Sequence, residues 1–147
     1  AISCLWSFLD PSHEKKIKEI AKKIAPHFYV TCSHELAPKW GEYERTTATV
    51  LNAYIGPITS GYLSRLDKSL KTIGYEQPMQ ISQSAGGTIS LSRSEQAPLL
   101  TLDSGPVAGV IGSVYLGKEM QFKNIITADL GGTSFDVGII LNQAPVV

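Results

Sequence analysis

The sequence has little cysteine, no excess of charge of either sign and no long apolar run. Its 147 residues include 2 cysteines, Cys4 and Cys32, which are too few for a disulfide framework and favour a reducing compartment, the cytoplasm. Because 13 Lys and Arg residues balance 13 Asp and Glu residues, no overall field attracts nucleic acid or an anionic membrane. The longest apolar run, residues 137–141, is far shorter than the roughly 20 residues of a membrane-spanning helix. We therefore expect no nucleic-acid partner and no membrane partner.

A chain of this length can bury one hydrophobic core, and its 43% of apolar and 18% of charged residues are typical of a globular protein. Both ends are apolar: residues 1–9 open the chain without a methionine, and residues 144–147 close it. Natural termini are usually polar and loosely held. We expect the sequence to be an internal stretch of a larger protein.

Strand and helix patterns alternate along the chain and predict an α/β fold. Residues 2–9 and 28–32 are predicted strands that flank a helix introduced by Asp10 and Pro11, which gives a β-α-β unit with a parallel strand pair.

This first helix has an amphipathic pattern. Ile17, Ile20 and Ile24 recur at helical spacing, and the lysines between them take the solvated face. The lysines could instead form a phosphate or partner patch, which the sequence favours less than a solvated face.

The remaining elements are predicted from apolar spacing and from turn residues. A long helix is predicted from Val50 or Leu51 to Ile73; Pro57 bends it or marks its start, and Gly74 ends it. A strand at 78–82, a turn at 85–87, a helix at 91–97 capped by Ser90 or Ser92, and a strand at 99–102 follow. The last elements are a helix at 107–116, opened by Ser104-Gly105-Pro106, and a hairpin of strands 125–128 and 135–141.

The strongest candidate for chemistry is the sequence Asp-Leu-Gly-Gly-Thr-Ser-Phe-Asp at residues 129–136, which joins the last two strands. A phosphate loop needs residues without side chains, so that backbone N–H groups can approach the phosphate oxygens. Gly131 and Gly132 meet that need, and Thr133 adds a hydroxyl donor. No G-K-[ST] follows, so this is not a P-loop.

Two aspartates flank this loop. Asp129 lies at the end of a predicted buried strand and is placed to hold a metal-bound water, since Mg²⁺ prefers carboxylate, water and phosphate oxygens. Asp136 could orient the loop from the second strand. The alternative is a simple Gly-Gly hairpin turn whose aspartates satisfy backbone donors.

The helix before this hairpin begins with almost no side-chain bulk, at residues 104–112. Small residues permit close backbone approach, which suits an interdomain hinge. Tight packing of the helix on a sheet is the alternative. The order small-residue helix, strand, D-x-G-G-T loop and second strand is more specific than either motif alone.

This arrangement resembles the actin-like ATPase superfamily and, more closely, the hydantoinase A / 5-oxoprolinase family, which includes acetone and acetophenone carboxylase subunits. Ala85 and Phe135 depart from residues that are common in the family. The matching stretches follow the family order and are residues 5–8, 10–14, 41–46, 51–54, 83–87, 104–110 and 129–136.

The resemblance implies part of an actin-like, ribonuclease H-like ATPase fold with a parallel-rich sheet and a C-terminal β-hairpin. Residues 1–45 would end the N-terminal hydantoinase/oxoprolinase lobe, and residues 46–147 would start the hydantoinase A lobe. The implied activity is ATP-dependent opening of a cyclic amide, such as hydantoin, N-methylhydantoin or 5-oxoproline, with ATP phosphorylating the amide oxygen before water attacks. We expect the isolated stretch to be inactive. The alternatives are an ATP-dependent acetone or acetophenone carboxylase subunit and a non-enzymatic, actin-like nucleotide switch.

The resemblance also implies site residues. Asp129 would be catalytic and would hold Mg through water, and residues 83–87 would border the same cleft. The family's first phosphate loop and its adenosine-binding segment are not found in this sequence. The implied partners are a hydantoinase B-like subunit and further copies in a homo-oligomer. The residues expected to bind ATP are Gly131, Gly132, Thr133, Asp136, Ser104, Gly105 and Gly109.

A charged string, Glu42-Tyr43-Glu44-Arg45, could supply a general base and an anion clamp. We favour a structural connector in which Arg45 binds one of the two carboxylates. His13, His27 and His34 have no cysteine or carboxylate at metal-ligand spacing, so we expect no zinc site. Both cysteines are expected to be free thiols on neighbouring strands.

Overall fold

The computed structural model describes residues 1–146 and divides into two compact units. Unit 1 comprises residues 1–79 and 90–99, and unit 2 comprises residues 80–89 and the chain from Leu100 onward. The expected lobe boundary between residues 45 and 46 concerns the intact protein and stays a prediction. No helix within residues 1–146 is long and apolar enough to cross a membrane.

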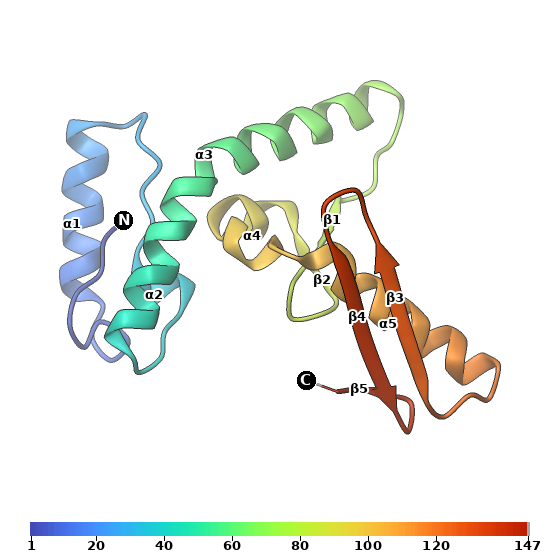
Figure 1. The fold of residues 1–147 in the computed structure, drawn as a ribbon. Coiled ribbons are helices and arrows are strands. Elements are labelled where there is room, and N and C mark those ends of the chain that lie inside the picture. Colours follow the sequence, from blue (N-terminus) through green and yellow to red (C-terminus); the bar gives the residue numbers. More distant parts are fainter. Residues whose placement is uncertain (147) are drawn as a thin grey trace. The chain divides into compact units, whose positions relative to one another are not determined.

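Figure 1 shows the order of the elements. Unit 1 contains α1 (Ser12–Ile24), α2 (Ser33–Leu36), α3 (Glu42–Thr72) and α4 (Leu91–Gln96), and unit 2 contains β1 (Gln80–Ser82), most of β2 (Thr88–Ser90), α5 (Ser104–Glu119), β3 (Ile125–Leu130), β4 (Phe135–Leu141) and β5 (Ala144–Pro145).

The sheets of the described chain are antiparallel, so the expected parallel-rich sheet is wrong for this stretch. Parallel pairing is limited to a single bridge between Ile2 and Cys32. The predicted strand over residues 2–9 folds into turns instead, with Trp6 at a φ of 60° and its carbonyl accepting from the N–H of Leu9 at 2.9 Å. This turn places the Trp6 ring 4.8 Å from the Trp40 ring, and such an aromatic contact is invisible to strand periodicity.

Helix α1 begins where Asp10 and Pro11 predict it, and the Asp10 carboxylate accepts the N–H of Ser12 at 3.0 Å. Its isoleucine stripe is exposed within the described residues, and Ile24 is 79% exposed. The residue of α1 that is buried is Glu14, whose carboxylate binds polar groups of the neighbouring segments. The described residues therefore leave the apolar face of α1 uncovered.

Helix α3 begins at Glu42, earlier than the apolar pattern predicts, and contains Pro57. It changes direction along its length in Figure 1, as expected of a helix with an internal proline. Gly74 follows its end at a φ of 89°, which confirms the expected helix terminator. The ring of Tyr29 lies directly on Gly56, where a Cβ atom would collide with it.

Ser90 caps α4 as predicted, because its side chain accepts the N–H of Arg93 at 3.3 Å. The predicted strand at residues 99–102 is wrong: Pro98–Thr101 forms a 3₁₀ turn. The N–H of Leu99 is bound by the Asn52 side chain at 3.0 Å rather than by a neighbouring strand.

In unit 2, β1 and β2 form a short hairpin whose turn contains Gly86 and Gly87, both at positive φ. The predicted hairpin at the C-terminal end is confirmed, with β3 pairing antiparallel to β4 and β4 to β5. Helix α5 packs on one face of this hairpin. At Gly138 an added Cβ would collide with the Val110 side chain and lie 2.5 Å from the Thr127 hydroxyl, so the close approach requires glycine.

Candidate functional site

A pocket of about 630 Å³ in unit 2 collects residues from four separate segments, one of which is Pro145 and Val146 near the C-terminal end. The turn after β1 contributes Ser84 and Ala85, and the D-x-G-G-T hairpin contributes Asp129 and Asp136. Helix α5 supplies the floor through its small residues, including Gly109. Of residues 83–87, which are expected to border the same cleft as Asp129, Ser84 and Ala85 line this pocket and the other three do not.

Asp129 and Asp136 are direct partners in the β3–β4 register, so their side chains leave the same face of the hairpin. Asp136 accepts a hydrogen bond from the Ser134 hydroxyl at 3.0 Å. Like charges directly opposite each other are unfavourable, and a divalent cation near them would relieve the repulsion. The donor set, two carboxylates in the lining of the pocket, is compatible with Mg²⁺.

The turn between these aspartates is tied by one hydrogen bond, from the N–H of Gly131 to the carbonyl of Ser134 at 2.9 Å. Within residues 1–146, the N–H groups of Gly132 and Thr133 have no protein acceptor. A Cβ on Gly132 would meet nothing within 4 Å. The turn thus offers free backbone donors without side-chain bulk, as a phosphate-binding turn requires, although Gly131, Gly132 and Thr133 do not themselves line the pocket.

The small-residue start of α5 is open along its outer side. Added Cβ atoms on Gly105, Gly109 and Gly112 would meet nothing within 4 Å. Of the expected ATP-binding residues on this helix, Gly109 lines the pocket, whereas Ser104 and Gly105 do not. Tight packing against the sheet instead occurs at Gly117, where a Cβ would collide with Ile125. The roles of these glycines toward a nucleotide stay predictions.

Arg45, the last residue of the charged string, is fully buried. Its guanidinium donates to the Ser33 hydroxyl at 3.1 Å, the Lys39 carbonyl at 3.1 Å and the Cys4 carbonyl at 2.8 Å. The partners differ from the expectation, because no carboxylate of the described chain accepts from Arg45. The sequence could not show that the partners are mostly backbone carbonyls.

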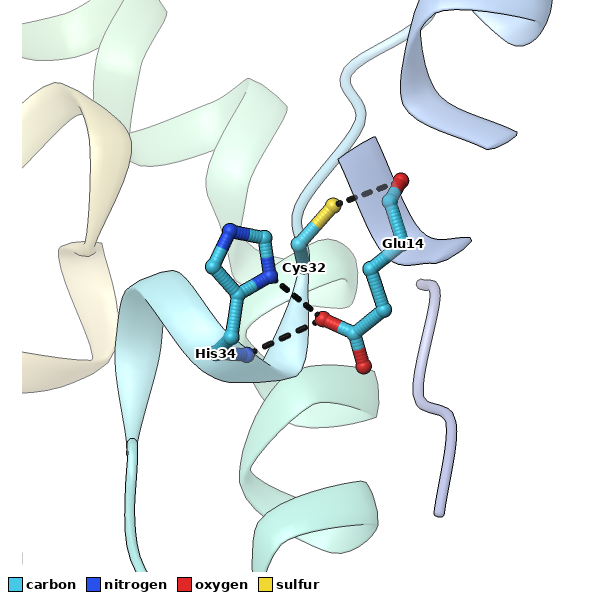
Figure 2. A group of neighbouring side chains, drawn as sticks. All are labelled: Glu14, Cys32 and His34. Carbon is cyan, nitrogen blue, oxygen red and sulfur yellow. Dashed lines mark hydrogen bonds and ion pairs between the residues drawn. The ribbon is translucent and has the colours of Figure 1, made fainter. Parts of the chain in front are cut away.

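A second cluster, absent from the sequence-based predictions, joins Glu14, Cys32 and His34 (Figure 2). The spacing of the histidines in the sequence predicts no metal-ligand set, but the fold brings a carboxylate and a thiol beside His34, and one potential ligand atom from each of the three residues lies within 4.8 Å of the others. Cys32 and His34 are neighbours in the chain, but Glu14 lies 18 and 20 positions before them, so no spacing rule connects all three.

The hydrogen bonds of Glu14 argue against a metal in this cluster. Its Oε1 accepts from the Cys4 N–H at 2.8 Å and the Ser33 hydroxyl at 2.5 Å, and its Oε2 accepts from the N–H and Nδ1 of His34 at 3.0 and 2.7 Å. Burial raises the pKa of Glu14, but these donors outweigh it and lower the pKa to about 2.

The thiol of Cys32 completes the cluster and is also engaged. It donates to the main-chain carbonyl of Glu14 at 3.7 Å. Burial, with the nearby Glu35 charge, raises the pKa of Cys32 to about 11, which disfavours the thiolate that metals bind. Both cysteines are free thiols, as expected. The hydrogen bonds of this cluster connect α1 with the start of α2.

Comparison with known proteins identifies the family of this chain. The family model described as hydantoinase/oxoprolinase matches residues 45–147, more than half of the sequence. The chain belongs to the hydantoinase/oxoprolinase family.

Three relatives illustrate the family. The acetophenone carboxylase gamma subunit of Aromatoleum aromaticum is 33% identical over 148 residues, which cover 97% of this chain and 20% of that subunit. A nucleotide-free structure of acetone carboxylase, described under the mechanism of ATP-dependent acetone carboxylation, is 35% identical in sequence, with a TM-score of 0.84. The match covers 97% of this chain and 20% of the acetone carboxylase chain. The structure of the ATP-dependent caprolactamase of Pseudomonas jessenii is 34% identical in sequence, with a TM-score of 0.82. The match covers 95% of this chain and 20% of the caprolactamase chain.

These matches confirm the mixed helix and strand fold and the family resemblance. The chain spans about a fifth of the length of the relatives it matches, which include a subunit of a larger enzyme.

Proposed function

We propose that this chain is part of an ATP-dependent hydrolase of cyclic amides, and that the unit 2 pocket faces the phosphates of ATP. One observation carries the proposal: the pocket joins the Asp129–Asp136 pair to the bare helix at Gly109, beside a turn with free backbone N–H groups. The actin-like fold of the intact protein is part of the proposal.

Backbone N–H groups would bind the phosphates of ATP, and carboxylates would bind the magnesium ion. The N–H groups of Gly132 and Thr133 would donate to phosphate oxygens, and Gly109 would leave room for them. Asp129 would hold Mg²⁺ through a water molecule, and Ser134 would fix the carboxylate of Asp136. When bound, ATP supplies the phosphoryl group that activates the amide oxygen.

The cyclic amide follows from the family description, hydantoinase/oxoprolinase, and from the likeness to a caprolactamase. The second candidate, activation of a ketone for carboxylation, is favoured by the equally close likeness to acetone carboxylase and an acetophenone carboxylase subunit. A hydantoinase B-like subunit, a homo-oligomer and a cytoplasmic location complete the proposal.

The first test replaces Asp129 by Asn in the intact protein. We expect substrate-dependent ATP hydrolysis to fall by at least about 100-fold, because charge stabilisation at a reacting centre is typically worth that much. Glu119→Gln, at the exposed end of the same helix-and-hairpin unit, is the matched control and should retain turnover. Retained turnover in Asp129→Asn would rule out the role given to this carboxylate.

A substrate panel separates the candidates. Hydantoin, N-methylhydantoin, 5-oxoproline and caprolactam should drive ATP consumption, and acetone with bicarbonate should not. The reverse pattern would establish the carboxylase candidate. Nucleotide-dependent partner binding without any turnover would establish a nucleotide switch instead.

The 147 residues alone carry one phosphate turn and no opposing one. We expect calorimetry to detect no ATP binding tighter than millimolar. Micromolar affinity would contradict a site built from two lobes.

A further inference from the structure

The residues that line a second pocket, of about 570 Å³, all belong to unit 1, and we call it the unit 1 pocket. Helices α1 and α4 and the segment of residues 28–31 supply most of its lining. Its volume is in the range of small-molecule sites, which combine apolar walls with a few polar groups. The aliphatic part of the wall consists of Pro26, Val30, Leu36 and Ala97.

The charged residues of this lining do not all pair with one another. Lys18 and Glu35 neutralise each other, because the Lys18 ammonium donates to both carboxylate oxygens of Glu35, at 2.8 and 2.6 Å. Lys22 and Glu95 form no ion pair within residues 1–146. The Arg93 guanidinium donates to the main-chain carbonyl of Glu35 at 3.2 Å, and no carboxylate of the described chain accepts from it. Two cations and one carboxylate of the pocket thus lack an ionic partner.

The lysines of α1 divide between this pocket and the solvent. Lys18 and Lys22 are four residues apart, which places them on one face of the helix, and both line the pocket. Lys15, Lys16 and Lys23 do not line it. A solvated face therefore accounts for only part of the lysine pattern, and the remaining two lysines lie at a cavity.

We propose that the unit 1 pocket binds an aliphatic amino acid. Its carboxylate would lie at Lys22 and Arg93, since ammonium and guanidinium groups are the usual partners of a carboxylate. Its ammonium group would lie at Glu95, and its methylene groups on the aliphatic wall. A phosphate ion would meet the same two cations, but it would leave Glu95 unpaired and the wall without an apolar partner.

The origin of this ligand rests on the proposed function. Hydrolysis of a lactam breaks the C–N bond, and water supplies a hydroxyl group to the carbonyl carbon and a proton to the nitrogen. The product therefore carries a carboxylate and an ammonium group, the two charges that the unpaired residues of the pocket require. The unit 1 pocket would be a product site, built from residues other than those at Asp129.

Calorimetry on the intact protein tests the class of ligand. The probe is 6-aminohexanoate, the product of opening caprolactam; hexanoate lacks its ammonium group, and hexylamine lacks its carboxylate. We expect each of these two controls to bind at least about 10-fold more weakly, since a hydrogen bond to a charged group is typically worth that much. Absence of binding by the probe, or equal affinity for hexanoate or inorganic phosphate, would overturn the proposal.

Variants of the intact protein locate the site. Lys22→Gln and Glu95→Gln should each weaken the binding of 6-aminohexanoate by about 10-fold. Lys23→Gln, on the same helix but outside the pocket lining, is the matched control and should leave the affinity unchanged. Equal affinities of Lys22→Gln and Lys23→Gln would overturn the proposal.

The same measurement in Asp129→Asn separates this inference from the proposed function. We expect this variant to lose ATP turnover and to keep its affinity for 6-aminohexanoate, because Asp129 does not line the unit 1 pocket. Loss of the affinity together with turnover would place the ligand in the unit 2 pocket and overturn the proposal.

Discussion

Unit 1 and unit 2 stabilise their interiors by different means. Within residues 1–146, the buried polar side chains all belong to unit 1, and each has hydrogen-bond partners; they are Ser7, Glu14, Thr31, Ser33, Arg45, Thr49, Asn52 and Ser94. Unit 2 buries little beyond Ile140 and Gly117, and its helix meets its hairpin through glycine. Unit 1 is thus specified by a polar network, and unit 2 by close approach of a helix to a sheet.

The two kinds of interior respond differently to the loss of a side chain. A satisfied polar network defines one arrangement of its partners, and removing a member leaves the others buried without a partner. Glycine-mediated contact leaves apolar side chains of unit 2 exposed, among them Ile126, Leu130 and Phe135. The buried polar side chains of unit 1 are satisfied by partners within the described chain.

The largest effect is expected from Arg45→Met. The change leaves the carbonyls of Cys4 and Lys39 without their donor and removes the positive charge that reaches Glu14 through Ser33. Loss of one partner from a buried charged network typically costs about 3–5 kcal/mol. Denaturant unfolding measures the loss, and Arg65→Met, at an exposed position of the same helix, should change stability by less than about 0.5 kcal/mol. Equal effects would refute a polar core in unit 1.

The second effect is a pH dependence carried by Glu14. Because its pKa is about 2 in the folded protein and near 4.5 when exposed, its stabilisation is present above pH 4.5 and is lost as the pH falls toward 2. The full difference corresponds to roughly 3 kcal/mol. Glu14→Gln should flatten the stability profile in this window, measured by unfolding at successive pH values. Glu44→Gln, at an exposed carboxylate, should leave the profile unchanged.

A smaller effect is expected in unit 2 from Gly138→Ala. The methyl group would collide with Val110 and crowd Thr127, and overpacking typically costs about 1–3 kcal/mol. Gly112→Ala is the matched control, since that position is open and alanine favours a helix by up to about 1 kcal/mol. Thermal unfolding should move in opposite directions for the two variants. A neutral Gly138→Ala would show that the helix and hairpin are not in close contact.

The smallest effect tests the start of α4. Ser90→Ala removes the side-chain acceptor for the Arg93 N–H and should cost about 1 kcal/mol. Ser90→Asp keeps an acceptor and should preserve stability in the same unfolding measurement. If alanine and aspartate behave alike, the cap does not contribute.

Local signals predicted the elements that depend on local chemistry. The Ser90 cap, the Gly74 terminator and the last hairpin each follow from residues within a few positions of one another. The strand predicted at residues 2–9 failed because apolar content cannot distinguish a strand from a turn that brings Trp6 to Trp40.

The candidate sites divide in the same way. The D-x-G-G-T hairpin was visible because its two aspartates flank one turn, and register places them together. The cluster of Glu14 with His34 joins residues 20 positions apart, and no periodicity connects a helix start to a distant loop. Its signal is a buried carboxylate, which only the folded chain reveals.

The register of β3 and β4 has a consequence for how the hairpin can vary in length. Asp129 faces Asp136 across a turn of residues 131–134, with the pocket and α5 on one side and exposed apolar side chains such as Phe135 on the other. Because side chains alternate between faces, a shift of one residue in the pairing of β4 with β3 would send Asp136 to the apolar side and Phe135 toward the pocket. A turn of another length that keeps Asp129 opposite Asp136 preserves the facing, since hairpin turns of about two to five residues all occur. We therefore expect the pairing register to be constrained and the length of the turn to be variable.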